Sequence, residues 1–379
     1  MDKIRIGVVG LGHRGRYMCH LIVENFDCNV LVAACDIDPE LWFKPQWREA
    51  KTMADAFPET KFYEDYTKML DENKLDIVFV ETGADVHANF CIQALGRDYS
   101  VFSDIPSVAS LEEADSLWKA KQASKGCFMT GANPNYWGHI EALVDLYRKG
   151  ILGEPYYMEA EYIHATRPGS EESIQLHVHS PWRKTLPPIR YCTHSLGPLL
   201  RILSEELRYT VCFGTGSHIQ DTGVRRDDMM SALFRTESGV AIRILRNGAC
   251  RAYFGHHSCR VFATKGYFER IGQRGSTPPV TRFCSTDLYG APTLTELPVG
   301  ETPVNLLGNP KAIGHGGVDY AMLDDMFKAF LNHAPDFPIT LREGLSMTLP
   351  GIYAAESARR GGELIRMTYP WDSDWKTEF

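Results

Sequence analysis

The chain has 379 residues, which is more than one ordinary hydrophobic core requires and enough for two domains. Apolar residues make up 44% of it and charged residues 23%, as is usual for a globular protein in water. The formal net charge is -8, and no cluster of Lys and Arg offsets it. This charge argues against nucleic acid or an anionic membrane as the main partner, because both would repel it.

The N-terminal region enters a strand pattern at Ile4, without the basic segment, apolar run and cleavage site of a signal peptide. No apolar stretch approaches the roughly 18 residues that indicate a membrane helix. The ten cysteines are scattered and include no Cys-x-x-Cys pair. These features predict reduced thiols and a cytoplasmic location.

The first 131 residues alternate between strand and helix patterns. The predicted strands are short and apolar, at residues 4–9, 29–35, 76–80, 99–103 and 127–130. Between them, amphipathic helices are predicted at residues 14–23, 46–57, 86–95 and 111–124. Near-continuous apolar strands separated by helices are typical of a parallel sheet that is covered on both faces. We therefore predict a doubly wound α/β (Rossmann) domain over residues 1–131.

The alternation stops near Gly131, and residues 132–379 show a different pattern. After a helix at residues 137–149, extended segments are predicted at residues 155–164, 207–218, 229–236, 239–247 and 258–269. Further helices are predicted at residues 318–332 and 341–360, and residues 167–188 are expected to form a loop over the site. This pattern predicts an α+β domain with a large, open, mostly antiparallel sheet, which serves substrate binding and oligomerisation.

A glycine-rich motif, Gly10-Leu11-Gly12-His13-Arg14-Gly15, follows the first predicted strand and opens the first predicted helix. The first glycine permits a tight turn, the second lets backbone amides approach a pyrophosphate, and the third lets the helix pack closely on the strand. The phosphates then lie at the helix N-terminus, where free N–H groups and the helix dipole favour anions. We predict that these six residues bind a dinucleotide.

Asp36 ends the second predicted strand, about 20 residues beyond the motif. A carboxylate at this point accepts hydrogen bonds from ribose hydroxyls and repels the 2′-phosphate of NADP, and no arginine follows directly. The position therefore favours NAD over NADP as the cofactor. The alternative interpretation is that Asp36 merely ends the strand in a turn before Asp38-Pro39.

At this point the motifs resemble those of the Gfo/Idh/MocA oxidoreductases, over nearly the whole chain. Glu81-Thr82-Gly83-Ala84-Asp85-Val86-His87 stands where that family has Thr-Pro-Asn-x-x-His, and Asp104-Ile105-Pro106 stands where it has Glu-Lys-Pro. The resemblance implies cofactor contacts from Thr82, His87, Asp104 and Pro106, and a homo-oligomer, either a dimer or a tetramer. The family's lysine helps proton transfer near the nicotinamide, but Ile105 can neither donate nor accept a proton.

Four segments resemble more narrowly the NAD-dependent glycosidases of glycoside hydrolase family 109, which also lack the lysine. They are Tyr162-Ile163-His164, Trp182-Arg183, Tyr191-Cys192-Thr193-His194-Ser195-Leu196-Gly197-Pro198 and Gly314-His315-Gly316-Gly317-Val318-Asp319. This resemblance implies that Tyr162, Arg183, Tyr191 and His194 surround a sugar. A further substrate tyrosine of that group falls near Gly255, where this sequence has no tyrosine in register.

Oxidation of a secondary alcohol by NAD requires a base for the hydroxyl proton. Because Ile105 cannot act, His194 is the first candidate, since imidazole titrates near neutral pH. Tyr191 could share or relay that proton, and Tyr162 completes the predicted catalytic set. The structural alternative is that His194 caps or fills the start of a helix at residues 195–203.

Four residues are predicted to bind the substrate: Arg183, Tyr162, His164 and His315. Arg183 offers a planar fork of donors to hydroxyls or a carboxylate, unless it is a surface arginine in a proline-rich loop. Tyr162 and His164 alternate along one strand and would point to the same face. His315 lies among glycines, which fits either a close backbone approach at a site or ordinary loop structure.

Other chemistries have less support in the sequence. His177-Val178-His179 and His256-His257 pair histidines, but neither pair has a clear third ligand, so no metal site is predicted. There is no Gly-x-Ser-x-Gly elbow of a serine hydrolase. No pair of carboxylates stands out as the site of a direct acid/base glycosidase.

Three functions remain open. The first is a redox-neutral glycosidase with bound NAD, in which oxidation, elimination, water addition and re-reduction follow one another. The second is a simple NAD-dependent sugar or inositol dehydrogenase that releases NADH after each turnover. Both take a small carbohydrate as substrate. The third is a non-catalytic NAD-binding regulator.

Overall fold

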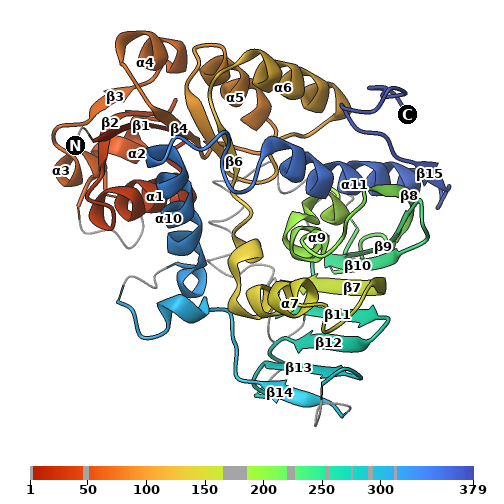
Figure 1. The fold of residues 1–379 in the computed structure, drawn as a ribbon. Coiled ribbons are helices and arrows are strands. Elements are labelled where there is room, and N and C mark those ends of the chain that lie inside the picture. The colour runs from red at the N-terminus through yellow and green to blue at the C-terminus, as the bar shows by residue number, and fades with distance from the viewer. Residues whose placement is uncertain are drawn as a thin grey trace. The chain divides into compact units, whose positions relative to one another are not determined.

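The computed structural model describes residues 3–45, 51–164, 186–219, 227–251, 256–274, 276–288, 293–310 and 314–379 (Figure 1). The chain forms two compact units. The first consists of Met1–Gly131, Leu323–Glu343 and Thr377–Phe379, and the second of Ala132–Met322 and Gly344–Lys376. The chain first passes between the units after Gly131. The second unit is nevertheless not one continuous segment, whereas the sequence analysis expects residues 132–379 to form a single domain.

The first unit contains a six-stranded sheet in the order β3-β2-β1-β4-β5-β6, in which neighbouring strands are parallel (Figure 1). Its strands are β1 (Ile4–Val9), β2 (Asn29–Cys35), β3 (Lys61–Tyr63), β4 (Ile77–Val80), β5 (Ser100–Ser103) and β6 (Phe128–Thr130). Every residue of β4 and β5 is buried, as in a sheet covered on both faces. This confirms the predicted doubly wound domain. The strand order reverses between β1 and β4, where such folds bind dinucleotides.

The helices of the first unit include α1 (His13–Glu24), α2 (Glu40–Phe43), α3 (Met53–Ala56), α4 (Tyr66–Glu72), α5 (His87–Leu95) and α6 (Leu111–Ala123). The helix predicted over residues 46–57 is too long. Thr52 and Asp55 cap each other reciprocally and start α3 at Met53, and residues 46–50 lie outside the described part. The sequence analysis missed α2, β3 and α4, because elements this short show little periodicity.

Helix α10 (Val318–Leu331) begins in the second unit and ends in the first. Its Phe327 is buried, and the centroid of its ring lies 4.9 Å from that of Phe26 and 6.4 Å from that of Phe79. Phe79 in turn stacks on Phe102, with the centroids 4.7 Å apart. These aromatic contacts explain why residues 323–343, which were expected in the second domain, belong to the core of the first unit.

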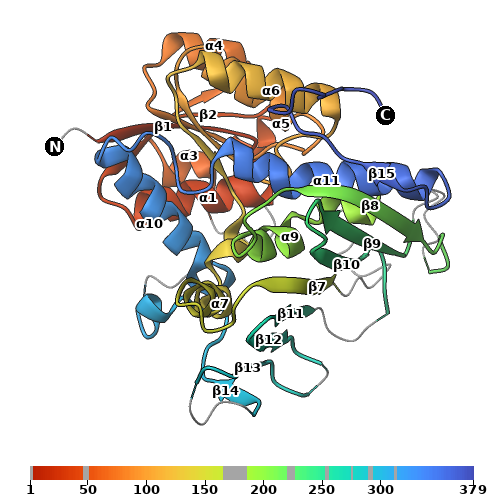
Figure 2. The same ribbon diagram turned by 45° about the vertical axis from the view of Figure 1, so that its right-hand side comes forward.

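The second unit contains a nine-stranded sheet in the order β14-β13-β12-β11-β7-β10-β9-β8-β15 (Figure 2). Its strands are β7 (Pro155–Ile163), β8 (Leu207–Gly214), β9 (Met229–Thr236), β10 (Ala241–Asn247), β11 (His256–Ala263), β12 (Gly266–Ile271), β13 (Val280–Ser285), β14 (Thr295–Leu297) and β15 (Ile365–Arg366). Among these strands, only β7 and β10 pair in parallel. The mostly antiparallel sheet confirms the predicted α+β fold.

The extended segment predicted over residues 258–269 is a hairpin of β11 and β12. The chain turns at Thr264 and Lys265, whose N–H groups donate to the carbonyl oxygens of Glu154 and Leu152. Because the turn between the two strands is very short, apolar and polar residues alternate almost without interruption from β11 to β12. This alternation alone therefore does not reveal where one strand ends and the next begins. The short strands β13, β14 and β15 were not predicted either.

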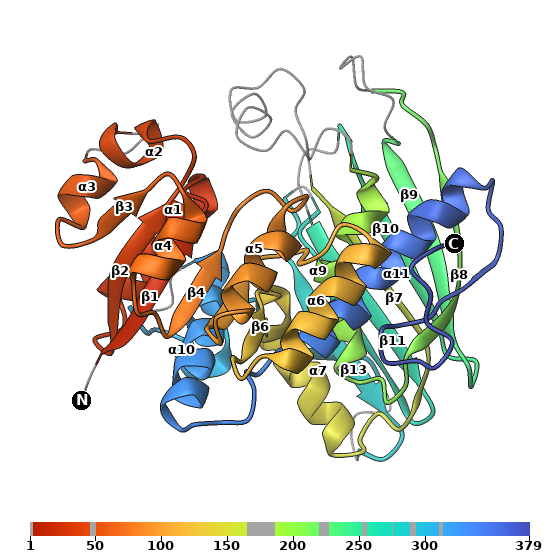
Figure 3. The same ribbon diagram turned by 90° about the horizontal axis from the view of Figure 1, so that it is seen from above.

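The second unit contains the helical elements η1 (Asn133–Tyr136), α7 (Gly138–Arg148), η3 (Pro188–Tyr191), α9 (Thr193–Leu200), η4 (Val304–Leu306), η5 (His315–Gly317) and most of α11 (Leu341–Arg359). Helices α9 and α11 lie against one face of the nine-stranded sheet (Figure 3). Throughout the described ranges, no helix is long and apolar enough to cross a membrane.

Candidate functional site

The loop between β1 and α1 has the geometry of a dinucleotide cradle. Gly10 adopts a φ of 90°, and an added Cβ there would lie 2.6 Å from the backbone of Glu81. An added Cβ at Gly15 would lie 1.8 Å from the carbonyl oxygen of Gly10, so only glycine lets α1 approach this closely. At Gly12, by contrast, an added Cβ would meet no atom within 4 Å. The backbone is therefore open to a ligand at Gly12.

The N-terminus of α1 is also suited to an anion. His13 is its first residue, and no described side chain caps the helix at Gly12. The guanidinium of Arg14 lies over the ring of Tyr17, 5.3 Å from its centroid. Uncapped N–H groups at a helix N-terminus, together with the helix dipole, bind diphosphates well. These features fit the diphosphate of a nicotinamide dinucleotide.

Asp36 forms the turn after β2 and also holds the glycine-rich loop. Its Oδ2 accepts a hydrogen bond of 2.6 Å from the N–H of Leu11, so it holds the glycine-rich loop. Its Oδ1 accepts a hydrogen bond of 3.0 Å from the N–H of Asp38, which forms the turn after β2. The residue is only half-buried. A carboxylate oxygen can accept more than one hydrogen bond, so Asp36 can also accept from a ribose hydroxyl.

His87 connects the loops that follow β4 and β5. Its Nδ1 lies 2.9 Å from the carbonyl oxygen of Pro106, and its Nε2 lies 2.8 Å from that of Thr82. The N–H of Asp104 donates to the carbonyl oxygen of Val80 at 3.0 Å. His87 is buried, so its ring supports both loops instead of facing solvent. Next to Pro106, Ile105 is buried as well and offers no titratable group.

In the second unit, rings gather around Tyr162, near the end of β7. The ring centroid of His257 lies 3.9 Å from that of Tyr162, that of His194 lies 5.6 Å away, and that of His164 lies 5.9 Å away. Tyr191 meets His194 edge-on at 5.1 Å. We call these five residues the Tyr162 cluster. It contains each of the described residues that the sequence analysis assigns to catalysis, together with His164.

Arg246, near the end of β10, brings a positive charge to the Tyr162 cluster. Its guanidinium carbon lies 3.9 Å from the ring centroid of Tyr162 and 5.5 Å from that of Tyr191. Nη1 donates to the carbonyl oxygen of Asn247 at 2.9 Å and to its Oδ1 at 3.0 Å. Asn247 also bonds the backbone N–H and carbonyl of His164, at 2.8 and 2.7 Å. A buried guanidinium against two aromatic rings makes the cluster rigid and positively charged.

His257 and Trp137 close another side of the cluster. Burial, assisted by the charge of Arg246, lowers the pKa of His257 well below its usual value of 6.5. The ring is therefore neutral near neutral pH, and it offers one donor and one acceptor. Trp137 packs edge-on against His257 with the centroids 4.7 Å apart, and it stacks on His139 at 5.3 Å. The result is a surface of aromatic faces with a few polar groups.

His139 makes the stability of the second unit dependent on pH. Burial, with a smaller contribution from the charge of Arg270, lowers the pKa of His139 from 6.5 to about 3. Unfolded chains bind this proton near pH 6.5, whereas the folded protein stays neutral down to about pH 3, so acid favours unfolding across that window. Between pH 7.5 and 5.5 we expect a loss of about 1.4 kcal/mol from this group alone. This loss is measured by urea unfolding of wild type and His139→Asn at both pH values. If the free energies of unfolding of the two proteins depended on pH in the same way, the prediction would be wrong.

His315 lies in η5, just before α10. Its Nδ1 is 2.8 Å from Oδ2 of Asp319, and its side chain is 62% exposed. Among the described residues, none of the ring contacts joins His315 to the Tyr162 cluster. The structure therefore brings together four of the residues predicted in the second unit, namely Tyr162, His164, Tyr191 and His194. His315 is held instead by Asp319.

Several sequence predictions lie outside the described residues. Arg183 is among them, and so are the paired histidines His177 and His179 and the loop position Gly255. The predicted substrate contact of Arg183 therefore stays a prediction. In the parts of the chain that the structure describes, no group of three or more His, Cys, Asp or Glu side chains is arranged to hold a metal ion.

Comparison with known proteins supports the resemblance. Residues 4–132 match the family described as "Oxidoreductase family, NAD-binding Rossmann fold", with the name GFO_IDH_MocA. This segment is similar to the NAD-binding domain of the Gfo/Idh/MocA oxidoreductases. The match confirms the family that the motifs indicated, the predicted cofactor, NAD, and the predicted class of enzyme, an NAD-dependent oxidoreductase.

The chain is similar in sequence to a glycosidase and similar in fold to solved NAD-binding oxidoreductases. It is 26% identical to Glycosyl hydrolase family 109 protein 1 of Bacteroides fragilis, over 85% of this chain and 75% of the relative. An oxidoreductase from Agrobacterium radiobacter, solved with NAD+, L-tartaric acid and magnesium, matches with a TM-score of 0.76 at 14% identity, over 96% and 98% of the two chains. Scyllo-inositol dehydrogenase from Lactobacillus casei, solved with NAD(H) and scyllo-inositol, matches with a TM-score of 0.73 at 15% identity, over 96% and 99%. The two solved structures share its fold.

Several residues of the candidate site were not predicted from the sequence. Arg246 and Trp137 belong to no recognisable motif. His257 was considered only with His256, as a possible pair of metal ligands without a clear third ligand. Asp319 lies in a motif that the family 109 resemblance covers, but it was assigned no role. Arg246 is the last residue but one of β10, and a cation near the end of a mostly apolar strand is the one signal that could have indicated it.

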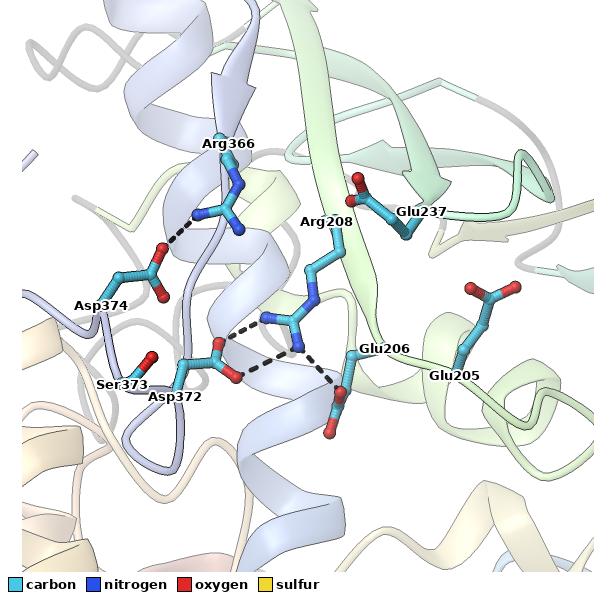
Figure 4. Close-up of a pocket in the computed structure, with 8 residues that line it drawn as sticks. All are labelled: Glu205, Glu206, Arg208, Glu237, Arg366, Asp372, Ser373 and Asp374. Atoms are coloured by element: carbon cyan, nitrogen blue, oxygen red, sulfur yellow. Dashed lines mark hydrogen bonds and ion pairs between the residues drawn. The ribbon is translucent and has the colours of Figure 1, made fainter.

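A further pocket lies in the second unit and is lined mainly by charged side chains (Figure 4). The lining residues are Glu205, Glu206, Arg208, Glu237, Arg366, Asp372, Ser373 and Asp374. Arg208 pairs with both Asp372 and Glu206, and Arg366 pairs with Asp374. These ion pairs hold the segment after β15 against β8 and β15, which gives the pocket a structural role.

Proposed function

We propose that this protein oxidises one hydroxyl of a small carbohydrate with NAD and uses that oxidation to cleave a glycosidic bond without net redox change. The observation that carries the proposal is the Tyr162 cluster, in which histidine rings gather around Tyr162 and the buried Arg246 lies over its ring. The similarity to a family 109 glycosidase over 85% of the chain supports the same function. We also propose that the protein forms a homo-oligomer.

The first unit would hold the cofactor. Backbone N–H groups of the loop at Gly12 and the start of α1 would bind the diphosphate, and Asp36 would accept from a ribose hydroxyl. When bound, NAD accepts a hydride from a carbinol carbon and can later return it. Ile105, where the family has a lysine, leaves the proton transfer to residues of the second unit.

The second unit would hold the sugar. Tyrosine and tryptophan rings pack against the C–H faces of sugar rings, while hydroxyls bond to polar groups between them. In this cluster Tyr162 and Trp137 supply aromatic rings, and neutral His257 offers one donor and one acceptor. Arg183 would add a donor fork from outside the described residues.

His194 would take the proton of the hydroxyl that is oxidised. Its ring lies between Tyr162 and Tyr191 at the start of α9, and its Nδ1 is buried. A fixed imidazole can accept a proton through its other nitrogen near neutral pH. The resulting ketone acidifies the hydrogen on the neighbouring carbon, so the glycosidic substituent can leave by elimination and water can add.

The proposal is tested by incubating the NAD-loaded protein with a panel of aryl glycosides and, separately, with free sugars and inositols. We expect release of the aryl alcohol without accumulation of NADH. In D2O, the recovered sugar should carry deuterium at the carbon next to the one that is oxidised. Steady accumulation of NADH with a free sugar or inositol would instead identify a simple dehydrogenase. If the protein bound NAD strongly but reacted with none of the glycosides, sugars or inositols, a non-catalytic regulator would be favoured.

A further inference from the structure

The side chain of His315 is held by a carboxylate that is fully buried. Nδ1 of His315 lies 2.8 Å from Oδ2 of Asp319, and Oδ1 of Asp319 accepts a hydrogen bond of 2.8 Å from the side-chain amide of Asn133. The side chain of Asp319 is 0% exposed, whereas that of His315 is 62% exposed. An ionised carboxylate only accepts hydrogen bonds, so the proton of a neutral His315 lies on Nδ1 and its lone pair lies on Nε2.

The backbone around His315 is held in an unusual conformation. His315 has a φ of 45°, between Gly314 at 71° and Gly316 at 75°, and Gly317 follows at 97°. Few residues other than glycine adopt this region, and they keep it only where the surroundings impose it. A buried charge also requires compensation, which Asn133 and His315 supply to Asp319. An exposed histidine that only formed a turn would need neither the constrained backbone nor a buried carboxylate as its partner.

The same hydrogen bonds connect His315 to the region of the Tyr162 cluster. Asn133 begins η1, and Trp137 follows directly after that element. Trp137 packs against His257, which contacts Tyr162. Asp319 is therefore anchored to the short segment that also carries one side of the cluster.

We propose that His315, positioned by Asp319, is a second acid–base residue of this enzyme and removes the carbon-bound proton that elimination requires. The inference rests on the proposed function, because only a glycosidase of the redox-neutral kind needs this step. His194 has by then received the proton of the oxidised hydroxyl. A second base is therefore required, and His315 has a lone pair on Nε2 in a side chain that is 62% exposed.

The step balances within the substrate, one water molecule and this one side chain. The hydrogen on the carbon next to the ketone leaves as a proton to Nε2 of His315. Its bonding electrons form a carbon–carbon double bond, and the bond to the glycosidic oxygen breaks with its electrons on that oxygen. The leaving oxygen takes a proton from the water molecule, whose hydroxide adds to the double bond at the carbon that lost the leaving group, and His315 returns its proton to the neighbouring carbon. Asp319 stays ionised and keeps the ring in the required tautomer.

The tautomer can be measured without any activity. In protein labelled with ¹⁵N in its histidines, the nitrogen shifts of His315, assigned by comparison with His315→Gln, should show a protonated Nδ1 and a bare Nε2 above neutral pH. Asp319→Asn replaces one acceptor by an amide that can donate, so the proton should move to Nε2. Asp324→Asn, on the same helix, is the matched control, since Asp324 pairs only with exposed Lys328 in the described structure. A bare Nδ1 in the wild type would overturn the inference.

The catalytic role of His315 is measured by exchange of the carbon-bound hydrogen of the substrate for deuterium in D2O. In His315→Gln and Asp319→Asn we expect deuterium incorporation and aryl alcohol release to fall by about 10²-fold or more. Oxidation itself should continue, so reduced cofactor should accumulate on the protein with substrate, and NAD affinity should not change. His20→Gln, an exposed histidine paired with Glu24, should behave as wild type.

The outcomes separate this inference from the function on which it rests. A wild type that never exchanges the carbon-bound hydrogen overturns both. A wild type that exchanges it, together with a His315→Gln variant that exchanges it equally fast, overturns only the role of His315. Loss of exchange in His315→Gln with normal exchange in Asp319→Asn would leave the base in place and overturn the positioning role of Asp319.

Discussion

Gly15→Ala is expected to destabilise the first unit by about 3 kcal/mol or more. The added Cβ would lie 1.8 Å from the carbonyl oxygen of Gly10, and a backbone atom cannot move aside as a flexible side chain can. Helix α1 would have to separate from β1, which would loosen the centre of the six-stranded sheet. Thermal unfolding of the protein without cofactor measures the effect.

Gly12→Ala should behave in the opposite way. Its Cβ would meet no atom within 4 Å, so the variant should fold with nearly wild-type stability. The methyl group would, however, occupy the space through which a diphosphate approaches the backbone, and NAD affinity should fall by about tenfold or more, or about 1.4 kcal/mol. Calorimetric titration of cofactor-free protein measures this loss.

The matched control for both glycines is Gly300→Ala, whose Cβ would also meet no atom within 4 Å. It should keep both stability and NAD affinity. Wild-type affinity in Gly12→Ala would show that the cofactor diphosphate does not bind at this loop. Unchanged melting of Gly15→Ala would show that α1 and β1 are not packed as described.

His194→Gln is expected to lower kcat by about 10² to 10⁴-fold, the usual contribution of a general base. Glutamine keeps a polar side chain of similar length but cannot take up a proton near neutral pH. Because the proposal gives His194 no part in cofactor binding, NAD affinity should stay at its wild-type value. Initial rates with the best substrate, together with calorimetric titration of NAD, check both statements.

The size of the loss gives a second criterion for His194. His20→Gln serves again as the control. If His194→Gln kept more than about a tenth of the wild-type rate, a role as the base would be excluded, and Tyr191 would be the next residue to test.

The cofactor loop could be predicted because its parts are adjacent in the chain. Gly10, Gly12 and Gly15 lie within one turn between a strand and a helix, so a local pattern is sufficient. Asp36 follows because neighbouring parallel strands end at the same edge of the sheet. The ring cluster is different. Tyr162 and His194 carried a recognisable motif, but Arg246 and His257 reach them only through the pairing of β7 with β10 and β11.

Strand pairing is decided by contacts that are distant in sequence, and no pattern in a single sequence reports them. The same limit explains the error at residues 323–343. The periodicity of α10 predicts a helix there, but it does not indicate that Phe327 packs against Phe26 and Phe79, which lie about 300 and 250 residues earlier.

The route of the chain also limits how this protein can be divided. A fragment ending at Gly131 would contain all six strands of the parallel sheet but would lack the aromatic side chain that covers Phe79. Such a fragment would expose an apolar surface and tend to aggregate. Any chimera that exchanges the nucleotide-binding half with a homologue must therefore carry helix α10 along, although α10 is encoded far downstream.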